Sequence, residues 1–215
     1  IFTLHRDDRD RCVEEILDTV CGLLADGMIA CYGTSNWRAE RIRALEARAA
    51  ARSVPPPVLS SVNLSLAFPN FEIWPNVEHC CDTETRSWYR SRQYPLLAWG
   101  CVGCGFLGDI APTDADRRGR VSRVYGSPRN WERLKRADQA AAATGLSRAQ
   151  IAWLWVLAQG LNLYPICGAH TIAQLKAAFA VEGTALSAAA ARWLNLEMDV
   201  PPEAGERWFH SPVRP

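Results

Sequence analysis

Short apolar runs alternate with longer segments whose apolar residues recur at helical spacing, and this pattern repeats five times along the chain. The first repeat predicts a strand at Ile1–Leu4 and a helix at Arg11–Asp26, which Gly27 ends. The later predicted strands are Met28–Tyr32, Val58–Leu64, Pro95–Trp99 and Asn162–Cys167. Strands separated by helices favour parallel pairing with right-handed crossovers.

The segments between these strands read as amphipathic helices with recognisable ends. Ser127 followed by Pro128 is typical of a helix start, and Ser147 begins another helix. The predicted helices after the first are Trp37–Arg52, Thr83–Gln93, 127–144, a segment that starts at Ser147, a segment that follows Gly168–Thr171 and runs through Val181, and Ser187–Leu196. The long irregular stretch Ser65–Asp82 carries Phe68, Phe71 and Trp74, and loops of that length are usually functional.

Five strand–helix units suit either a doubly wound sheet or part of an eightfold barrel. Polar residues follow the carboxyl ends of the predicted strands, where both folds build their sites, and the polar turn Gly33–Asn36 is one example. A doubly wound sheet that binds a dinucleotide usually carries Gly-x-Gly-x-x-Gly after its first strand, and this chain has no such motif there.

Composition indicates a globular protein of 215 residues with 48% hydrophobic residues, 22% charged residues and a net charge of +1. The balance shows no bias toward nucleic acid or an anionic membrane, and no apolar run is long enough to span a bilayer. We predict one domain over 1–200 and a polar tail over 201–215.

The arginine run at 117–123 adjoins Asp114 and Asp116, which favours a solvated loop over a nucleic-acid patch. Lysine occurs only at Lys135 and Lys176.

The chain contains eight cysteines, which is below the density of a disulfide scaffold. We interpret most of them as buried, reduced thiols of a cytoplasmic protein. Cys101 and Cys104 form a C-x-x-C pair, and His79, Cys80 and Cys81 are further possible ligands, so a zinc site or a redox pair is an alternative. No second C-x-x-C is present, and we predict no metal site.

Five segments, each directly after or within a predicted strand, resemble the aldo/keto reductase family in the family's own order. They are LHRDD at His5, GTSNW at Gly33–Trp37, SSVNLSLA at Ser60–Ala67, LLAWGCVGCGFLG at Leu96–Gly108 and PICGAHTIAQL at Pro165–Leu175. The resemblance implies an α/β fold, specifically a partial (β/α)8 TIM barrel whose five units correspond to barrel strands 4–8. It also implies an oxidoreductase that reduces aldehyde or ketone carbonyls of small molecules by hydride transfer.

In that family a Tyr acts as general acid beside an Asp, a Lys and a His. Only His5 matches a member of this tetrad, with the implied role of orienting the carbonyl oxygen. Without the resemblance, His5 reads as an ordinary polar residue at a strand end. The Asp, Tyr and Lys belong to earlier strands, so we predict that this chain alone is inactive.

The resemblance also implies a nicotinamide site. Ser35, Asn36 and Asn63 match residues that bind the carboxamide, with Asn63 standing where Gln is common. An alternative is that Ser35 and Asn36 cap the helix that begins near Trp37. Trp99 matches an aromatic residue that stacks on the nicotinamide, and its alternative is core packing.

Two further segments match family residues that bind the phosphates of the cofactor. Small residues after the fourth strand are implied to line the pyrophosphate path: Gly100, Cys101, Val102 and Gly105. The start of the helix after the fifth strand is implied to hold the adenosine phosphate, through Gly168, His170 and Gln174. We expect NADPH as cofactor, with NADH possible because His170 stands where Arg or Lys is common. The alternative function is a non-catalytic module that binds a nucleotide and a partner.

Overall fold

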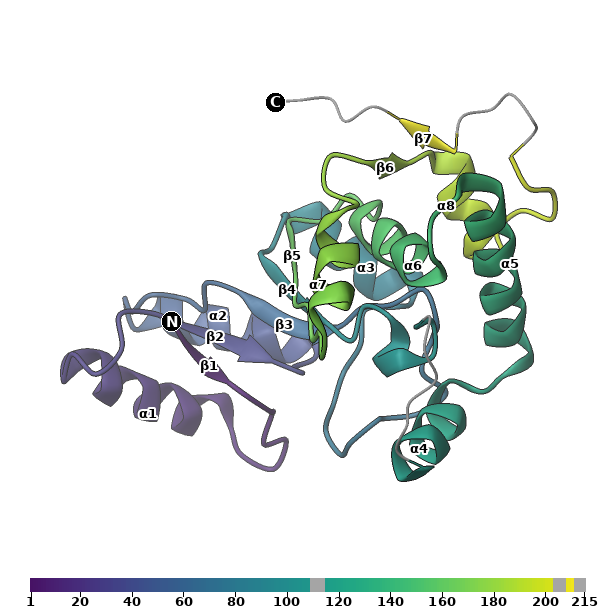
Figure 1. Cartoon of the computed structure of the whole chain (residues 1–215). Coiled ribbons are helices and arrows are strands. Elements are labelled where there is room, and N and C mark those ends of the chain that lie inside the picture. Colours follow the sequence, from purple (N-terminus) through teal and green to yellow (C-terminus); the bar gives the residue numbers. More distant parts are fainter. Residues whose placement is uncertain (109–114, 203–207, 211–215) are drawn as a thin grey trace. The chain divides into compact units, whose positions relative to one another are not determined.

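Five strands form one sheet whose order in space follows the order along the chain. The first three pair in parallel, with Phe2 opposite Tyr32 and Thr34 opposite Ser60. The structure is a computed structural model that describes residues 1–108, 115–202 and 208–210 (Figure 1). The strands are β1 (Phe2–Leu4), β2 (Tyr32–Ser35), β3 (Ser60–Asn63), β4 (Leu96–Trp99) and β5 (Leu163–Pro165). The predicted α/β architecture with a parallel sheet is confirmed.

The chain folds as two compact units, which we describe separately. The first unit comprises residues 1–63, 74–98 and 161–164. The second comprises residues 64–73 and the described parts of 99–160 and 165–215. The sheet lies in the first unit, except that Trp99 and Pro165, the last residues of β4 and β5, are assigned to the second.

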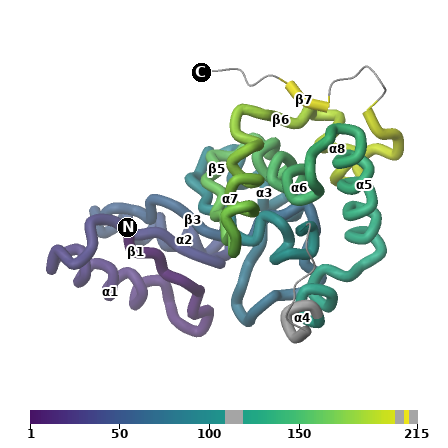
Figure 2. The backbone as a smooth tube through the Cα atoms, viewed as in Figure 1, coloured from purple at the N-terminus to yellow at the C-terminus, as the bar shows by residue number. Residues whose placement is uncertain are grey.

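Three helices of the first unit begin and end within two residues of their predicted bounds. They are α1 (Val13–Ala25), α2 (Ala39–Ala51) and α3 (Thr83–Arg92). The helices α1 and α2, purple and blue in Figure 2, pack against each other. Leu17 and Val20 of α1 and Ile42 and Leu45 of α2 are fully buried, so burial of one apolar stripe on each helix stabilises this layer.

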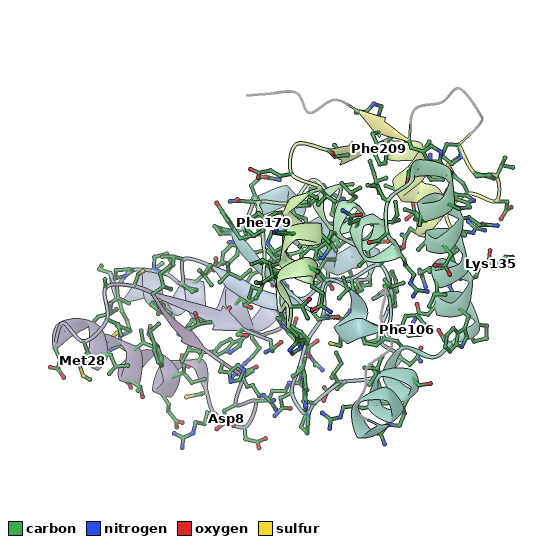
Figure 3. The ribbon with its side chains drawn as sticks, in the orientation of Figure 1. Asp8, Met28, Phe106, Lys135, Phe179 and Phe209 are labelled. Carbon is green, nitrogen blue, oxygen red and sulfur yellow. The ribbon has the colours of Figure 1, made fainter. Side chains whose placement is uncertain are left out.

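The prediction for the second strand was wrong, because it placed the strand at Met28–Tyr32 and a turn at Gly33–Asn36. In the structure β2 starts only at Tyr32, and the predicted turn residues up to Ser35 belong to it. Met28, labelled in Figure 3, is 70% exposed in the connection after α1. The strand sequence YGTS contains little apolar signal, although all four of its residues are buried and Gly33 packs closely against Leu59. A Cβ atom at Gly33 would lie 2.6 Å from the Leu59 side chain and 2.9 Å from its carbonyl oxygen.

The second unit is mostly helical, and side-chain caps define where its helices start. Ser127, Ser147, Thr171 and Ser187 each accept a hydrogen bond from the backbone amide three residues later, and the predicted starts at Ser127 and Ser147 are confirmed. The elements are the 3-10 turn η1 (Gly103–Gly105), α4 (Ala115–Tyr125), α5 (Pro128–Thr144), α6 (Arg148–Leu157), α7 (Ile172–Phe179), β6 (Ala185–Leu186), α8 (Ala188–Leu194) and β7 (Phe209–His210).

Three elements of this unit, α4, β6 and β7, were absent from the sequence prediction. The arginine run, predicted as a loop, lies within α4. Part of the predicted polar tail forms β7, which pairs antiparallel with β6. The Trp208 ring packs edge-on against Trp193 with centroids 5.7 Å apart, so an aromatic contact accompanies the short ladder.

The expectation that most cysteines are buried was also wrong. All eight are free thiols, but only Cys80, Cys81 and Cys101 are buried, while Cys12 and Cys167 are exposed. Both exposed cysteines lie outside regular elements, where an apolar neighbour in the sequence does not imply a core position. Among the helices of the described ranges, none is long and apolar enough to cross a membrane.

We predict that Gly33→Ala destabilises the protein by about 1–3 kcal/mol, because the added methyl group would overlap Leu59. The matched control is Gly22→Ala on α1, where a Cβ meets no atom within 4 Å. Removing the flexibility of a helical glycine should stabilise the control by about 0.4–1 kcal/mol. Urea unfolding of both variants measures these effects, and equal stability of the two would contradict the close approach at Gly33.

Candidate functional site

Several of the predicted site residues meet at the carboxyl ends of β1, β2 and β3. Ser35 and Asn63 are the last residues of β2 and β3, and His5 and Asn36 directly follow β1 and β2. Because the three strands are parallel, their carboxyl ends share one edge of the sheet. The first unit therefore gathers these four polar residues on adjacent strand ends.

Asn36 links the three strand ends through its main chain and its side chain. Its backbone amide donates to the Ser61 carbonyl at 2.8 Å, and Nδ2 donates to the His5 carbonyl and to Ser35 Oγ, both at 3.0 Å. Its φ of 63° is left-handed, a region that Asn tolerates better than other residues with a side chain. Both amide protons of the Asn36 side chain are thus used within the protein, and Oδ1 is the acceptor of that side chain.

The alternative interpretation of Ser35 and Asn36 as helix caps is wrong. The N-cap of α2 is Arg38, which makes no side-chain capping hydrogen bond. Ser35 and Asn36 are instead buried, at 5% and 4% exposure, and bond to each other at the strand ends. Their polar atoms are therefore directed to the strand edge rather than to the helix.

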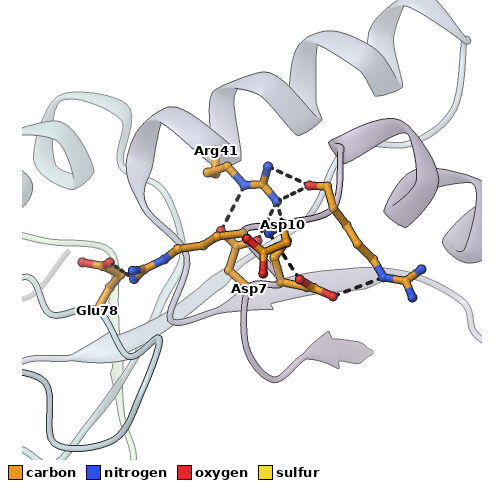
Figure 4. A network of polar contacts seen from close by, with 7 residues as sticks. Asp7, Asp10, Arg41 and Glu78 are labelled. Atoms are coloured by element: carbon orange, nitrogen blue, oxygen red, sulfur yellow. Dashed lines mark hydrogen bonds and ion pairs between the residues drawn. The ribbon is translucent and has the colours of Figure 1, made fainter.

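The loop after β1 contains a buried ion pair that the sequence analysis missed. Asp7 is only 3% exposed, although His5 and Asp8 on either side are exposed. Arg41 of α2 donates to it from Nε at 3.0 Å and from Nη2 at 2.8 Å (Figure 4). The Arg41 guanidinium also lies over the ring of Trp37, which precedes the helix, and no local pattern in the sequence links either residue to Asp7.

Asn63 is buried next to Cys80, Cys81 and His79. Its carbonyl accepts from the Cys80 amide at 2.8 Å, and the Cys81 sulfur lies 3.6 Å from Asn63 Oδ1. His79 forms an isolated parallel bridge with Asn63, and its Nδ1 accepts from the Cys81 amide at 3.3 Å. Burial lowers the pKa of His79, an effect that nearby Asp82 partly opposes.

The thiols do not assemble a metal centre in the described residues. His79, Cys80 and Cys81 belong to the first unit and the C-x-x-C pair to the second. Within residues 1–108, 115–202 and 208–210, no group of three or more His, Cys, Asp or Glu side chains is arranged to hold a metal ion. Cys104 instead has its sulfur 3.9 Å from the Tyr125 hydroxyl.

In the second unit, the predicted pyrophosphate segment forms a tight turn. Gly100 and Gly105 have φ values of 67° and 107°, which explains glycine at both positions. The amide of Leu107 donates to the Val102 carbonyl at 3.0 Å, whereas the Val102 amide has no hydrogen-bond partner in the described part of the chain. Cys101 is buried and Val102 is half-buried. The Val102 N–H is one donor at this turn.

Trp99, the predicted stacking residue, ends β4 and is half-buried. Its carbonyl accepts a hydrogen bond from the Leu64 amide at 3.2 Å. Partial exposure suits stacking and core packing alike, so both interpretations of Trp99 stand.

The predicted adenosine phosphate segment lies at the start of α7. Thr171 caps the helix, and Gln174 Oε1 accepts from the amides of His170 at 2.8 Å and Thr171 at 3.2 Å. This capping box occupies amides that we expected to be available to a phosphate. Nε2 of Gln174 is therefore the side-chain atom suited to donate. Gly168 has no left-handed φ, and a Cβ there would meet no atom within 4 Å, so nothing in the described structure itself requires glycine.

The first turn of α6 contacts both the end of the glycine-rich turn and the helix α7. Arg148 Nη2 donates to the Gly108 carbonyl at 2.7 Å, at the end of the glycine-rich turn. Gln150 Nε2 donates to the Ala177 carbonyl of α7 at 3.1 Å.

The sequence model of the aldo/keto reductase family matches residues 1–193. The chain therefore belongs to the aldo/keto reductase family.

Two solved structures show a related fold at low sequence identity. One is the glycerol dehydrogenase AKR11B4 from Gluconobacter oxydans, at 21% identity and a TM-score of 0.64, with 94% of this chain and 60% of that chain covered. The other is the thermostable aldo-keto reductase Tm1743 in complex with the inhibitor epalrestat, at 16% identity and a TM-score of 0.61, with 90% and 58% covered. The chain thus spans about three fifths of the length of these structures. No curated protein matches the sequence.

We predict that the free energy of unfolding falls as the pH drops from about 7.5 to about 5.5, in part because of His79. The unfolded imidazole binds a proton in this range, whereas the folded one resists it, since burial lowers its pKa and Nδ1 accepts the Cys81 amide. His79→Asn keeps an acceptor without titrating and should show a smaller loss. Urea midpoints at the two pH values measure this, with His210→Asn on exposed β7 as control. An unchanged loss in His79→Asn would contradict the assignment.

Proposed function

We propose that this chain is the portion of an aldo/keto reductase barrel that carries strands 4–8, over residues 1–200, with 201–215 as a tail. The order of the sheet supports this, because β1 and β5 are its two edges. A closed barrel has no such edges. At the β1 edge, Ile1 and Phe2 are 74% and 41% exposed. Such exposure is expected of an edge strand that another strand would cover.

The helix α7 gives independent support for an open barrel. It has no buried residue, and its apolar side chains Ile172, Leu175 and Phe179 are 72%, 42% and 65% exposed. Phe179 is labelled in Figure 3. A barrel helix normally buries one apolar stripe, so the proposal assigns the cover of this face to the first barrel units.

The function that the site supports best is NAD(P)H-dependent reduction of an aldehyde or ketone group of a small molecule. The observation that carries it is the cluster of His5, Ser35 and Asn36 at the carboxyl ends of β1 and β2. Bound NADPH or NADH would supply the hydride. Ser35 Oγ and Asn36 Oδ1 would orient the nicotinamide carboxamide, and Asn63 would extend this set from β3. The exposed His5 imidazole would hold the carbonyl oxygen on which negative charge develops.

The phosphate segments of the second unit fit a dinucleotide in two respects. The Val102 amide, beside Gly100, Cys101 and Gly105, has no partner among the described residues, and such an N–H can bind a pyrophosphate oxygen. The position of Gly168 leaves room for a ligand against the main chain. His170 and Gln174 Nε2 would contact the adenosine phosphate. NADPH is the proposed cofactor, and NADH is also possible because His170 stands where Arg or Lys is common.

The alternative function is a nucleotide-binding module that docks a partner without catalysis. The state of the tyrosines and lysines favours this alternative, because a reductase of this family uses a Tyr as general acid and a Lys beside it. Burial raises the pKa of Tyr32 to about 12 and also raises the pKa of Tyr89 and Tyr94, which makes each a poor general acid. Lys135 pairs with Glu132 at 3.5 Å on α5, and Lys176 lies in the last turn of α7.

We predict that the 215-residue chain binds NADPH without reducing simple aldehydes. Asn36→Gly should weaken the binding about tenfold, because it removes the side-chain hydrogen bonds and keeps a residue suited to a left-handed φ. The matched control is Ser53→Gly, since Ser53 has a similar φ of 55° and lies between the end of α2 and the start of β3. Titration of NADPH fluorescence measures the affinities.

Absence of NADPH binding by the wild-type chain would overturn the proposed function. Equal weakening by both substitutions would contradict the role of Asn36. Aldehyde reduction by this chain alone would contradict the predicted inactivity and would exclude the non-catalytic alternative.

A further inference from the structure

We infer that Asp7 and Arg41 are positioning residues that fix the main chain of His5 at the carboxyl end of β1. The inference rests on the proposed function in that His5 is the residue that would face the carbonyl group. The geometry that carries it lies entirely within the first unit.

The first observation is the burial of a carboxylate in an otherwise exposed, charged loop. Between β1 and α1 the chain reads His5-Arg6-Asp7-Asp8-Arg9-Asp10-Arg11-Cys12, and Asp7 is the residue of this loop that is buried. Its side chain is 1% exposed, compared with 56% for that of Asp8. Removing a carboxylate from water is costly unless it is paired and hydrogen-bonded. A single strong partner therefore has to hold Asp7 in this place.

Arg41 meets this requirement with every nitrogen of its guanidinium group. Nε and Nη2 donate to the two carboxylate oxygens of Asp7, which is the bidentate geometry that gives such pairs their directional strength. Nη1 and Nη2 also donate to the Arg11 carbonyl at 3.2 Å, and Nη2 donates to the Asp8 carbonyl at 3.1 Å. Arg41 thus contacts the loop at Asp7, Asp8 and Arg11, and Figure 4 shows its position beside Asp7.

The surroundings of Arg41 favour this one orientation. Its guanidinium carbon lies 5.3 Å from the centroid of the Trp37 ring, and the Trp37 side chain is buried. Arg41 is also in the first turn of α2, where the helix dipole disfavours a positive charge. The carboxylate of Asp7 offsets that cost, so the pair is matched to its place on the helix.

His5 is consequently fixed through its main chain from two sides. Asn36 Nδ2 donates to the His5 carbonyl at 3.0 Å, and Asp7, two residues later, is fixed by Arg41. The imidazole of His5 forms no hydrogen bond with any residue that the structure describes. Its direction therefore depends on these two backbone anchors.

Two other ion pairs between α1 and α2 provide a matched comparison. Arg48 pairs with Glu14 and Arg52 with Asp18, each at 2.5 Å, and all four side chains are at least 41% exposed. Neither pair reaches the loop that carries His5. Substitution of Arg52 thus removes an α1–α2 ion pair without altering the anchoring of His5.

The experiment is two-dimensional NMR of the imidazole Cε1–H groups of the full chain, whose four histidines give four signals. His5→Gln assigns the His5 signal. We expect Arg41→Gln to shift or split the His5 signal and to leave those of His79, His170 and His210 in place. Asp7→Asn should reproduce this change, and Arg41→Lys should restore only part of the wild-type signal, because an ammonium group cannot form the fork. Arg52→Gln should change none of the four.

An unchanged His5 signal in both Arg41→Gln and Asp7→Asn would overturn the inference. Joint movement of all four signals in both variants would also overturn it, since the pair would then support the fold as a whole. Addition of NADPH separates this question from the proposed function. If NADPH perturbs no signal of the wild-type protein, the proposed function is wrong, while the comparison without NADPH still decides the role of Arg41.

Discussion

The arrangement of the first unit depends on the way Asn36 joins three strand ends. A left-handed residue directly after β2 turns its own amide toward β3 and its side-chain amide toward β1, which are the two neighbours of β2 in the sheet. The chain thereby leaves the strand edge with its polar groups satisfied by the adjacent strands rather than by water. Ser35, His5 and Asn36 come together as a result of this single turn.

The same region shows how charge is placed next to the candidate site without being part of it. The guanidinium of Arg41 and the carboxylate of Asp7 neutralise each other beneath the loop, while the His5 imidazole stays exposed. A second carboxylate, Glu78, forms ion pairs with Arg9 at 2.5 Å and with Arg38 at 2.8 Å. These ion pairs fix the loops and leave little net charge beside the strand ends. The neutral polar atoms at the strand ends are therefore the groups that would meet a neutral carboxamide.

Much of the fold could be predicted from the sequence because its signals are local. Amphipathic spacing defined α1 and α2, and Ser followed by Pro defined the start of α5. The failures occur where position depends on distant residues. β2 is polar and depends on the approach of Leu59 to Gly33, and β7 depends on a ladder with β6.

The candidate residues at the strand ends could be predicted because they sit in short segments that resemble a family. Asp7 and Arg41 could not be derived in the same way, since their pairing joins residues 34 positions apart. The capping role of Gln174 was missed for a different reason, because the same side chain suits a phosphate contact and a capping box.

The most direct test of the account is a map of backbone amide shifts when NADPH is added to the ¹⁵N-labelled chain. The account predicts that the largest changes fall on Ser35 and Asn36 in the first unit and on Val102 and Gly168 in the second. Saturable changes confined to other segments, or no saturable change at all, would contradict the claim that this chain carries the nucleotide site of an aldo/keto reductase.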